Sequence, residues 1–317
     1  MLNVIVWGNQ EQYDLFINQI KAEELKGNIC VKGVVSEDCA WSNKIDEYEM
    51  IDKKVLLQEL GGVKIDCVLV TSVQSHFYTT KEEILSILPD VKIINARVLN
   101  IPRFDFRRYW EVLEGKVSII SNSCWGGLTY NSVYMEFLSP FINLSIAPLD
   151  YIRLLKNFSE HMSQPLEMVR DRSVQGNPIG RIGDVEIDFV HYRNFAEAKA
   201  CWEKRSKRIN YNNLLIYMPI ENEEVAQMFA ELPIERKYGF CNFYINYKSL
   251  YYVKHFENSG EVQRGFGGRR FSSYMNDQAR RKLYDYDDAI GNRGAKTVKI
   301  YDVLKLLNGE DKFFSYY

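Results

Sequence analysis

The sequence predicts an α/β protein of two domains, of which the first is a mostly parallel sheet flanked by helices. The chain has 317 residues, more than the roughly 250 to 300 at which a single hydrophobic core usually stops growing. Short β-branched runs alternate with amphipathic helical stretches in the amino-terminal third, and this alternation is typical of parallel sheets. The 46% hydrophobic and 26% charged residues belong to an ordinary globular chain.

The first domain begins with a strand that ends at Gly8. A helical stripe follows and stops at Gly27. Thr80 and Glu83 form a capping box that predicts the start of a later helix. The expected order is strand Val4–Trp7, helix from Tyr13 to Ile20, strand Ile29–Val35, helix Val55–Leu60, strand Asp66–Thr71, helix from Thr80 to Pro89 and strand Val91–Ile94.

This order resembles a Rossmann-like domain, but its dinucleotide loop is incomplete. Gly8 is present, and Glu37 or Asp38 stands where an acid would bind the ribose. Gln10 and Tyr13 replace the second and third glycines of the G-x-G-x-x-G pattern. We therefore expect no tight NAD binding and a scaffold that positions or dimerises the second domain. A loosely held nucleotide or nucleotide-sugar remains the alternative.

An amphipathic segment marks the expected domain boundary. Phe106, Tyr109, Trp110 and Leu113 fall at helical spacing between Arg103 and Glu114. We place the first domain at residues 1–114 and a larger α/β domain at residues 115–317.

The second domain is expected to open with a strand over Val117–Ile120 and a small-residue loop over Ser121–Gly127. Asp150 is expected to cap a helix with Tyr151, Leu154, Leu155 and Phe158 on one face. Val185, Ile187 and Phe189 alternate with Glu186 and Asp188, which predicts a strand that leads to His191.

Asn194 and Glu197 form a capping box that predicts a helix from Phe195 to Ile209. Arg205 falls on the same face as the apolar residues Phe195, Ala198, Trp202 and Ile209. A buried guanidinium needs a partner. We expect either an internal carboxylate, Asp188 or Asp150, or an anionic group of a ligand.

From about Lys116 onward, the chain resembles a bacterial family that is usually described as exopolysaccharide biosynthesis proteins. The resemblance rests on Ser121–Gly127 with Tyr130, Ser139-Pro140 to Asn143, Asp150, and the string His191-Tyr192, Glu197-Ala198, Trp202, Arg205, Arg208-Ile209-Asn210. It implies a role in surface-polysaccharide assembly. It supplies no catalytic residues, so the roles assigned below come from the residues themselves.

Three residues are candidates for catalysis. His191, at a strand-to-helix junction, suits a general base. Cys124, in the small-residue loop, could act as a nucleophile, and Asp188 as a second acid or base. A semi-buried structural histidine and a structural loop are the alternatives. The residues expected to bind ligand in the same region are Asn122, Trp125, Gly126, Gly127, Tyr130, Trp202, Arg205, Arg208 and Asn210.

A glycine-rich basic segment, Arg264–Arg270, contains Arg264, Arg269 and Arg270. Backbone amides between arginines can cradle phosphate, although the Walker pattern is absent. Between Glu261 and Ile300 there are nine Lys and Arg against five Asp and Glu. A mobile, solvated loop is the alternative.

Charge and composition argue against several classes of protein. A net charge of -2 gives no overall attraction to nucleic acid. No apolar run reaches the roughly 18 to 20 residues of a membrane span, and no secretory signal is visible, so we expect a cytoplasmic protein. The six scattered cysteines are expected to be reduced, and neither they nor the four histidines have metal-ligand spacing.

These observations leave two leading hypotheses. The first is a surface-polysaccharide enzyme, a transferase that uses a nucleotide-activated or phosphorylated sugar; its cofactor is unknown. The second is a non-catalytic scaffold that assembles with itself or with a glycosyltransferase. An NAD-dependent sugar oxidoreductase is disfavoured by the missing glycines. A polar cleft lined by His191, Arg205 and Trp125 would favour the enzyme, and a filled core around them the scaffold.

Overall fold

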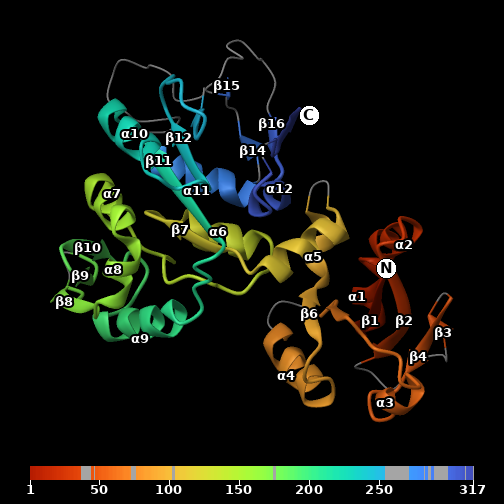
Figure 1. Ribbon diagram of the computed structural model, residues 1–317. Coiled ribbons are helices and arrows are strands. Elements are labelled where there is room, and N and C mark those ends of the chain that lie inside the picture. The colour runs from red at the N-terminus through yellow and green to blue at the C-terminus, as the bar shows by residue number, and fades with distance from the viewer. Residues whose placement is uncertain are drawn as a thin grey trace. The chain divides into compact units, whose positions relative to one another are not determined.

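The computed structural model describes residues 1–36, 44–45, 47–72, 76–101, 104–173, 176–253, 271–281, 283–284, 287–288, 299–310 and 312–316. The chain forms two compact units, Met1–Trp110 and Glu111–Tyr317. Each unit contains its own parallel sheet with helices, which confirms the predicted α/β class (Figure 1).

The first unit is built on a six-stranded sheet in which only the edge strand β3 is antiparallel, among the described residues. Its strands in spatial order are β3 (Lys44–Ile45), β4 (Tyr48–Ile51), β2 (Ile29–Ser36), β1 (Leu2–Gly8), β5 (Cys67–Val70) and β6 (Lys92–Asn95). The helices are α1 (Gln10–Asp14), α2 (Ile17–Leu25), α3 (Leu56–Glu59), α4 (Phe77–Ile87) and the 3-10 helix η1 (Ala96–Asn100). The chain reverses its lateral direction between β1 and β5, which makes this pair the topological switch point.

Two helices of this unit begin elsewhere than expected. The stripe from Tyr13 to Ile20 is divided between α1 and α2. Helix α1 begins at Gln10 because Asn9 caps it by accepting a hydrogen bond from the amide of Gln12. Helix α4 begins at Phe77, not at Thr80. The amide of Thr80 donates to the carbonyl of His76, so Thr80 already lies inside the helix. It therefore cannot be the N-cap residue, which is His76.

The second unit contains a five-stranded sheet whose strands in spatial order are β15 (Asp287–Asp288), β13 (Leu250–Tyr252), β12 (Lys237–Cys241), β11 (Leu214–Ile220) and β7 (Ser118–Ser121). All but β15 run parallel. The two smaller antiparallel sheets are β8 (Glu167–Arg170), β9 (Ile179–Ile182) and β10 (Val185–Asp188), and β14 (Leu283–Tyr284), β16 (Lys299–Tyr301) and β17 (Phe314–Tyr316).

The helices beyond η1 are α5 (Phe106–Gly115), α6 (Trp125–Ser132), α7 (Pro148–Lys156), α8 (Phe158–Ser163), α9 (Phe195–Ser206), α10 (Glu223–Ala230), α11 (Phe271–Arg281) and α12 (Val303–Leu307). Helix α7 packs against β10 and α10, and α11 packs against α6 and β11 (Figure 1). The main core of this unit joins one face of β7 and β11 to α7, α9 and α10.

The starts and ends of two helices in the second unit also differ from expectation. Asp150 lies in the first turn of α7, whose N-cap is Ala147 with Pro148 at the first helical position. Proline is well suited to that position because its missing N–H would have no partner there. Asn194 does cap α9, as predicted, by accepting from the amide of Glu197 at 2.8 Å, but the helix ends at Ser206.

Candidate functional site

The small-residue loop follows β7 and turns directly into α6, at the carboxyl edge of the parallel strands. The hydroxyl of Ser121 accepts from the amide of Ser123 at 3.2 Å and donates to the carbonyl of Ser123 at 3.1 Å. Ligands of open α/β sheets bind outside the carboxyl ends of the strands. This loop is therefore the place where the second unit would hold one.

Asn122 is the residue of this loop with an unfilled hydrogen-bonding group. It is 6% exposed. Its backbone carbonyl accepts from the amide of Ile146 at 3.1 Å, and its Nδ2 donates to the carbonyl of Ile146 at 3.4 Å. Its Oδ1 is buried without a hydrogen-bond partner in the part of the chain that the structure describes. Such a group lacks the compensation for its lost hydration.

A second element reaches the loop from far along the chain. The hydroxyl of Ser123 lies 3.4 Å from Oδ1 of Asn276, which belongs to α11. Helix α11 begins at Phe271. The basic segment Arg264–Arg270 directly precedes it in the sequence and lies outside the described residues.

The aromatic and glycine residues after the loop pack inside the unit. Trp125 is fully buried and stacks on Tyr217 with ring centroids 3.9 Å apart. A Cβ on Gly126 would lie 3.2 Å from Cγ2 of Ile119, so the missing side chain lets α6 approach β7. Gly127 is similar, with a Cβ position 3.0 Å from Cγ2 of Ile142. Ligand contact by Trp125, Gly126 or Gly127 stays a prediction.

Tyr130 is equally buried and ties α6 to the start of β7. Its hydroxyl donates to the carbonyl of Val117 at 2.8 Å and accepts from the amide of Ile119 at 2.9 Å. Burial raises the pKa of Tyr130. Both hydrogen-bonding functions of the phenol are thus used within the protein.

The three catalytic candidates lie in different settings. Cys124 is half-buried and is the N-cap residue of α6. The backbone of Asp188 pairs with that of Ser145, the residue before Ile146, to which Asn122 is bonded. Oδ1 of Asp188 is buried without a partner in the described chain. His191 is exposed in the turn between β10 and α9. The backbone pairing thus links Asp188 to the Asn122 loop. The catalytic roles of Cys124, Asp188 and His191 stay predictions.

Arg205 has an internal partner that differs from the carboxylates we expected. Its Nη1 donates to the hydroxyl of Tyr192 at 2.6 Å, and its guanidinium carbon lies 5.0 Å from the centroid of the Phe137 ring. Asp150, one of the expected partners, pairs with Arg153 at 3.1 Å. A phenol and an aromatic face therefore satisfy a guanidinium that is only half-buried.

The remaining predicted ligand residues of this region make internal contacts. Arg208 pairs with Glu136 at 2.8 Å. Trp202 is 5% exposed and packs edge to face on Phe141. Asn210 donates from Nδ2 to the carbonyl of Gly115 at 3.1 Å and so holds the turn after α9. Their contact with a ligand stays a prediction.

A polar cluster that sequence reasoning missed lies between α8 and the turn from β9 to β10. Nε2 of His161 lies 2.8 Å from Oδ1 of Asp184, and Nδ1 lies 3.0 Å from the carbonyl of Asn157. Nε of Arg153 adds an ion pair to Asp184 at 3.3 Å. Hydrogen bonding from His161 lowers the pKa of Asp184, and the charge of Arg153 contributes to the same shift. The two residues before Val185, Gly183-Asp184, signal this hairpin turn in the sequence.

Gly8 lies at the end of β1, close to the side chain of Thr71. A Cβ on Gly8 would lie 1.9 Å from Oγ1 of Thr71 and 3.5 Å from Oε1 of Gln12, so the strand ends pack closely at this glycine. Glu37 and Asp38 lie outside the described residues.

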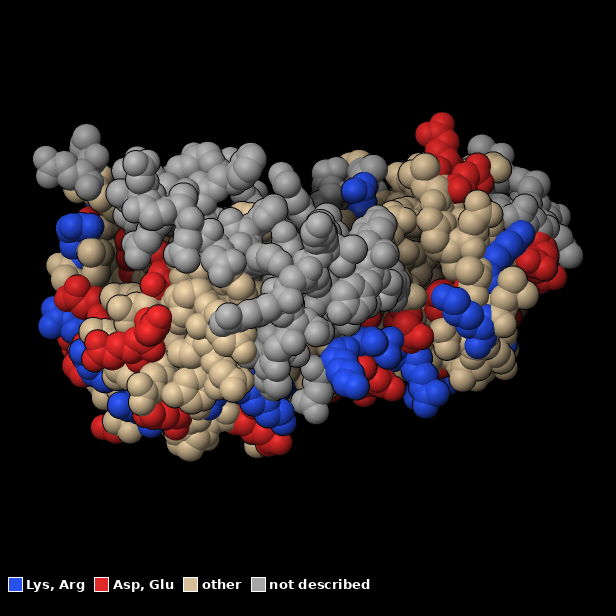
Figure 2. Space-filling view, turned by 90° about the horizontal axis from the view of Figure 1, so that it is seen from above, with Lys and Arg blue, Asp and Glu red and all other residues tan. Residues whose placement is uncertain are grey.

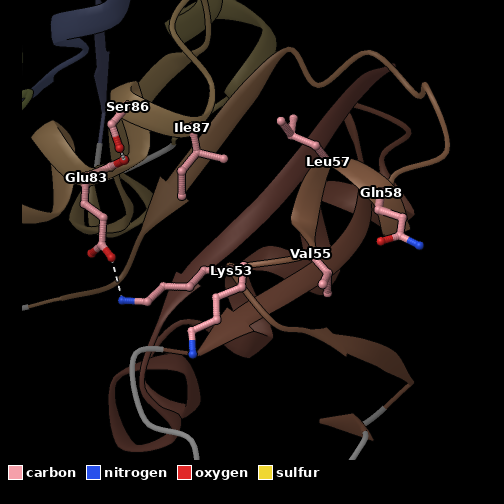
Figure 3. A pocket seen from close by; sticks show the side chains of 8 residues that line it. Lys53, Val55, Leu57, Gln58, Glu83, Ser86 and Ile87 are labelled. Atoms are coloured by element: carbon pink, nitrogen blue, oxygen red, sulfur yellow. Dashed lines mark hydrogen bonds and ion pairs between the residues drawn. The ribbon is translucent and has the colours of Figure 1, made fainter.

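An open pocket of about 570 Å³ lies between α3 and α4 of the first unit (Figure 3). It is lined by Lys53, Lys54, Val55, Leu57, Gln58, Glu83, Ser86 and Ile87. Nζ of Lys53 is ion-paired with Oε1 of Glu83 at 2.5 Å across it. The apolar part of the lining includes Val55 and Leu57, which are 37% and 61% exposed.

Charged groups of both signs are interspersed on the face of the molecule seen in Figure 2. Among the described residues, no three His, Cys, Asp or Glu side chains gather in a way that could hold a metal ion. Within the same residues, no helix combines the length and apolar character needed to cross a bilayer.

Two family models match the sequence. The model described as "Domain of unknown function (DUF1919)" matches residues 95–287, and the model described as "C2185-like, N-terminal" matches residues 1–98. A Haemophilus influenzae protein named "Uncharacterized protein" is 35% identical over 150 residues. That alignment covers 46% of this chain and 72% of the relative.

Proposed function

The chain belongs to the DUF1919 family, and we propose that it is an enzyme of surface-polysaccharide assembly. In this proposal the second unit acts on a nucleotide-activated or phosphorylated sugar at the Asn122 loop. The polysaccharide context comes from the sequence resemblance of the loop and of the string from His191 to Asn210. The topology supports the proposed position of the site, because the loop lies at the carboxyl edge of parallel strands, where open sheets usually bind ligands.

The observation that carries the proposal is the buried Oδ1 of Asn122, which has no hydrogen-bond partner among the residues that the structure describes. A buried acceptor without a partner costs roughly 1 to 3 kcal/mol. Its Nδ2 and its backbone carbonyl are both bonded to Ile146, which fixes the amide in place. A sugar hydroxyl would donate to Oδ1 and remove that cost.

Asn276 of α11 lies beside Ser123 of this loop. In the proposal Arg264, Arg269 and Arg270, which precede α11 in the sequence and lie outside the described residues, would supply positive charge for a phosphate. In a glycosyl transfer the bond from the anomeric carbon to the phosphate oxygen breaks and the acceptor oxygen takes its place. The acceptor proton would pass to a carboxylate, for which Asp188 is our candidate.

The test is a thermal-unfolding screen of the full chain with nucleotides, nucleotide-sugars and sugar phosphates. A ligand at 100 times its Kd should add about 2.7 kcal/mol of stability. In the variant Asn122→Leu we expect the ligand response to disappear. The stability of the unliganded protein should change little, because the loss of the long Nδ2 bond to the carbonyl of Ile146 offsets the removal of an oxygen without a partner in the described chain. The matched control is Asn131→Leu, at an exposed position of α6. A ligand response that survives Asn122→Leu would contradict the proposed site.

A second candidate function is a non-catalytic scaffold. It is favoured by the filled surroundings of Trp125, which is 0% exposed. We expected a filled core around His191, Arg205 and Trp125 for a scaffold; Trp125 fits this expectation, whereas Arg205 is half-buried and His191 is exposed. This function would be supported if none of the nucleotide-sugars or sugar phosphates raised the thermal stability of the chain and light scattering showed a stable oligomer.

A further inference from the structure

One edge of the small antiparallel sheet β8–β9–β10 in the second unit is open to solvent. β8 is the edge strand, because it pairs with β9 alone among the described strands (Figure 1). All four of its residues are exposed, and the apolar residues Met168 and Val169 are 60% and 38% exposed. The backbone groups of β8 that point away from β9 have no partner within the described residues. Such an edge is a template for another strand.

The opposite edge of this sheet is already occupied. Asp188, the last residue of β10, exchanges two backbone hydrogen bonds with Ser145, at 2.8 and 2.9 Å. Helix α7 packs against β10 as well. If the strand added to β8 is β8 of a second copy, the open edges of both copies are used at once. Such two-fold pairing closes at a dimer.

A β-bulge brings the two charged ends of β8 to one face of the sheet. Glu167 pairs with Arg181 of β9. Arg170 pairs with Ile179, and Val169 is an extra residue without a counterpart on β9. Arg181 and Ile179 lie two residues apart and project to the same face, and directly opposed residues share a face. Glu167 and Arg170 therefore share a face, which the spacing of a regular strand would not allow.

The charges on that face alternate in sign from strand to strand. Glu186 of β10 pairs with Arg181 of β9, and their side chains form an ion pair at 3.8 Å. Arg181 pairs in turn with Glu167 of β8. The carboxylate of Glu167 has neither an ion pair nor a hydrogen bond among the residues that the structure describes. A strand added beyond β8 should therefore place a cation opposite Glu167.

We propose that β8 pairs antiparallel with β8 of a second copy of this chain and joins the two small sheets into one. The two-fold axis passes between Met168 and Val169, so Glu167 of each copy faces Arg170 of the other. Arg170 is exposed, and its Nη2 donates to the carbonyl of Asn177 at 3.2 Å, which leaves Nε and Nη1 for a carboxylate. Met168 and Val169 of the two copies cover each other. A parallel arrangement in register would instead place like charges side by side.

This pairing is independent of the sugar site proposed at the Asn122 loop, which follows β7 in a different sheet. Asn122→Leu should therefore associate as the unchanged protein does, whatever its response to ligands. Because an enzyme and a scaffold can both be dimeric, the pairing by itself favours neither proposed function.

Sedimentation velocity of the full chain over a range of concentrations measures the association, and we expect a reversible dimer. Glu167→Arg and Arg170→Glu each bring like charges together at both symmetric contacts, so each should weaken dimerisation by roughly tenfold or more. An equimolar mixture of the two variants should associate again, because every contact then joins opposite charges. Glu203→Arg, at an exposed position of α9, is the control and should dimerise as the unchanged protein does.

The mixture also guards against a failure to fold, since an unfolded variant could not restore the dimer. The inference is overturned if the unchanged protein stays monomeric, which would leave the edge to a strand of another protein. It is equally overturned if either single variant dimerises as the unchanged protein does, or if the mixture of the two stays monomeric.

Discussion

Arg205 and Tyr192 form a hydrogen-bonded pair in which the guanidinium donates to a neutral phenol at 2.6 Å. The hydroxyl of Tyr192 in turn donates to the carbonyl of Ile142 at 3.1 Å. Burial raises the pKa of Tyr192, although the nearby charge of Arg205 opposes that shift. The phenol therefore keeps its proton and can both accept and donate. An arginine on a largely apolar helix face is thus accommodated without a carboxylate.

The first prediction separates this pair from a buried ion pair. Tyr192→Phe should lower the free energy of unfolding by about 1 to 3 kcal/mol, because it removes a hydrogen bond to a charged group. Arg205→Met should cost about 1 kcal/mol, since methionine keeps the packing on Phe137 and leaves no charge unpaired. Urea denaturation measures both values.

The control for this prediction is Arg193→Met, because the side chain of Arg193 is 87% exposed. We expect it to change stability by less than about 0.5 kcal/mol. Breaking a buried ion pair typically lowers the free energy of unfolding by roughly 3 to 5 kcal/mol. A loss of that size in Arg205→Met would contradict the assignment of Tyr192 as the partner of Arg205.

Local patterns in the sequence predicted local structure well. The alternation of strands and helices gave the α/β class, and the Asn194 cap of α9 is confirmed. The same periodicity placed Arg205 on the correct helix face, yet it could not give its partner. Tyr192 lies only 13 residues away in the sequence. Whether the two side chains meet depends on the conformation of the turn that joins β10 to α9, which helical spacing does not give. Helical spacing defines a direction and not the tertiary neighbour.

At the candidate site, contacts between residues that are distant in the sequence could not be predicted. The loop after β7 was found because small residues follow a strand. Oδ1 of Asn122 has no partner within the described residues, while Nδ2 of the same amide donates to Ile146, which lies 24 residues further on. Its neighbour Ser123 meets Asn276 across a separation of 153 residues. Such meetings follow from the order of strands in the sheet, which single-sequence patterns do not specify.

The second prediction concerns acid stability and Asp184. Both ring nitrogens of His161 face oxygen acceptors, so the ring can donate to the carboxylate of Asp184. This hydrogen bond, and to a lesser degree Arg153, lowers the pKa of Asp184 from its ordinary 3.8. A carboxyl with a lowered pKa in the folded state stabilises the protein above its unfolded pKa. That contribution is lost as the pH falls through the folded pKa.

Asp184→Asn should therefore reduce stability near neutral pH, and the difference from the unchanged protein should shrink as the pH falls below 3.8. Denaturation curves at a series of pH values measure this difference. Asp14→Asn, at an exposed position of α1, is the matched control and should show no such trend. A difference that stays constant through the acid range would show that the carboxylate charge at Asp184 plays no part.

The third prediction is that the first unit does not bind NAD or NADH at micromolar concentration. Gln10 and Tyr13 stand in place of the second and third loop glycines, which let the backbone approach a pyrophosphate and the helix pack on the strand. We therefore expect a pyrophosphate to be held poorly here. A fluorescence titration with NADH measures binding directly. Micromolar affinity that disappears when Glu37 or Asp38 is substituted would show the prediction to be wrong.

The fourth prediction assigns a packing role to Gly8. A Cβ at this position would lie 1.9 Å from Oγ1 and 3.2 Å from Cβ of Thr71. Thr71 is 4% exposed, and its hydroxyl donates to the carbonyl of Trp7 at 3.2 Å, so its side chain has little freedom to move away. Gly8→Ala should lower the free energy of unfolding by about 1 to 3 kcal/mol through overpacking.

A double-mutant cycle identifies Thr71 as the cause of that cost. In a Thr71→Ala background the closest contact disappears, whereas the Cβ contact at 3.2 Å remains. Gly8→Ala should therefore cost less there, with a coupling energy of about 1 kcal/mol. Thr79→Ala, at an exposed position of α4, is the background control and should leave the cost of Gly8→Ala unchanged. Equal costs in the Thr71 and Thr79 backgrounds would mean that backbone conformation at Gly8, and not the neighbouring strand end, requires glycine.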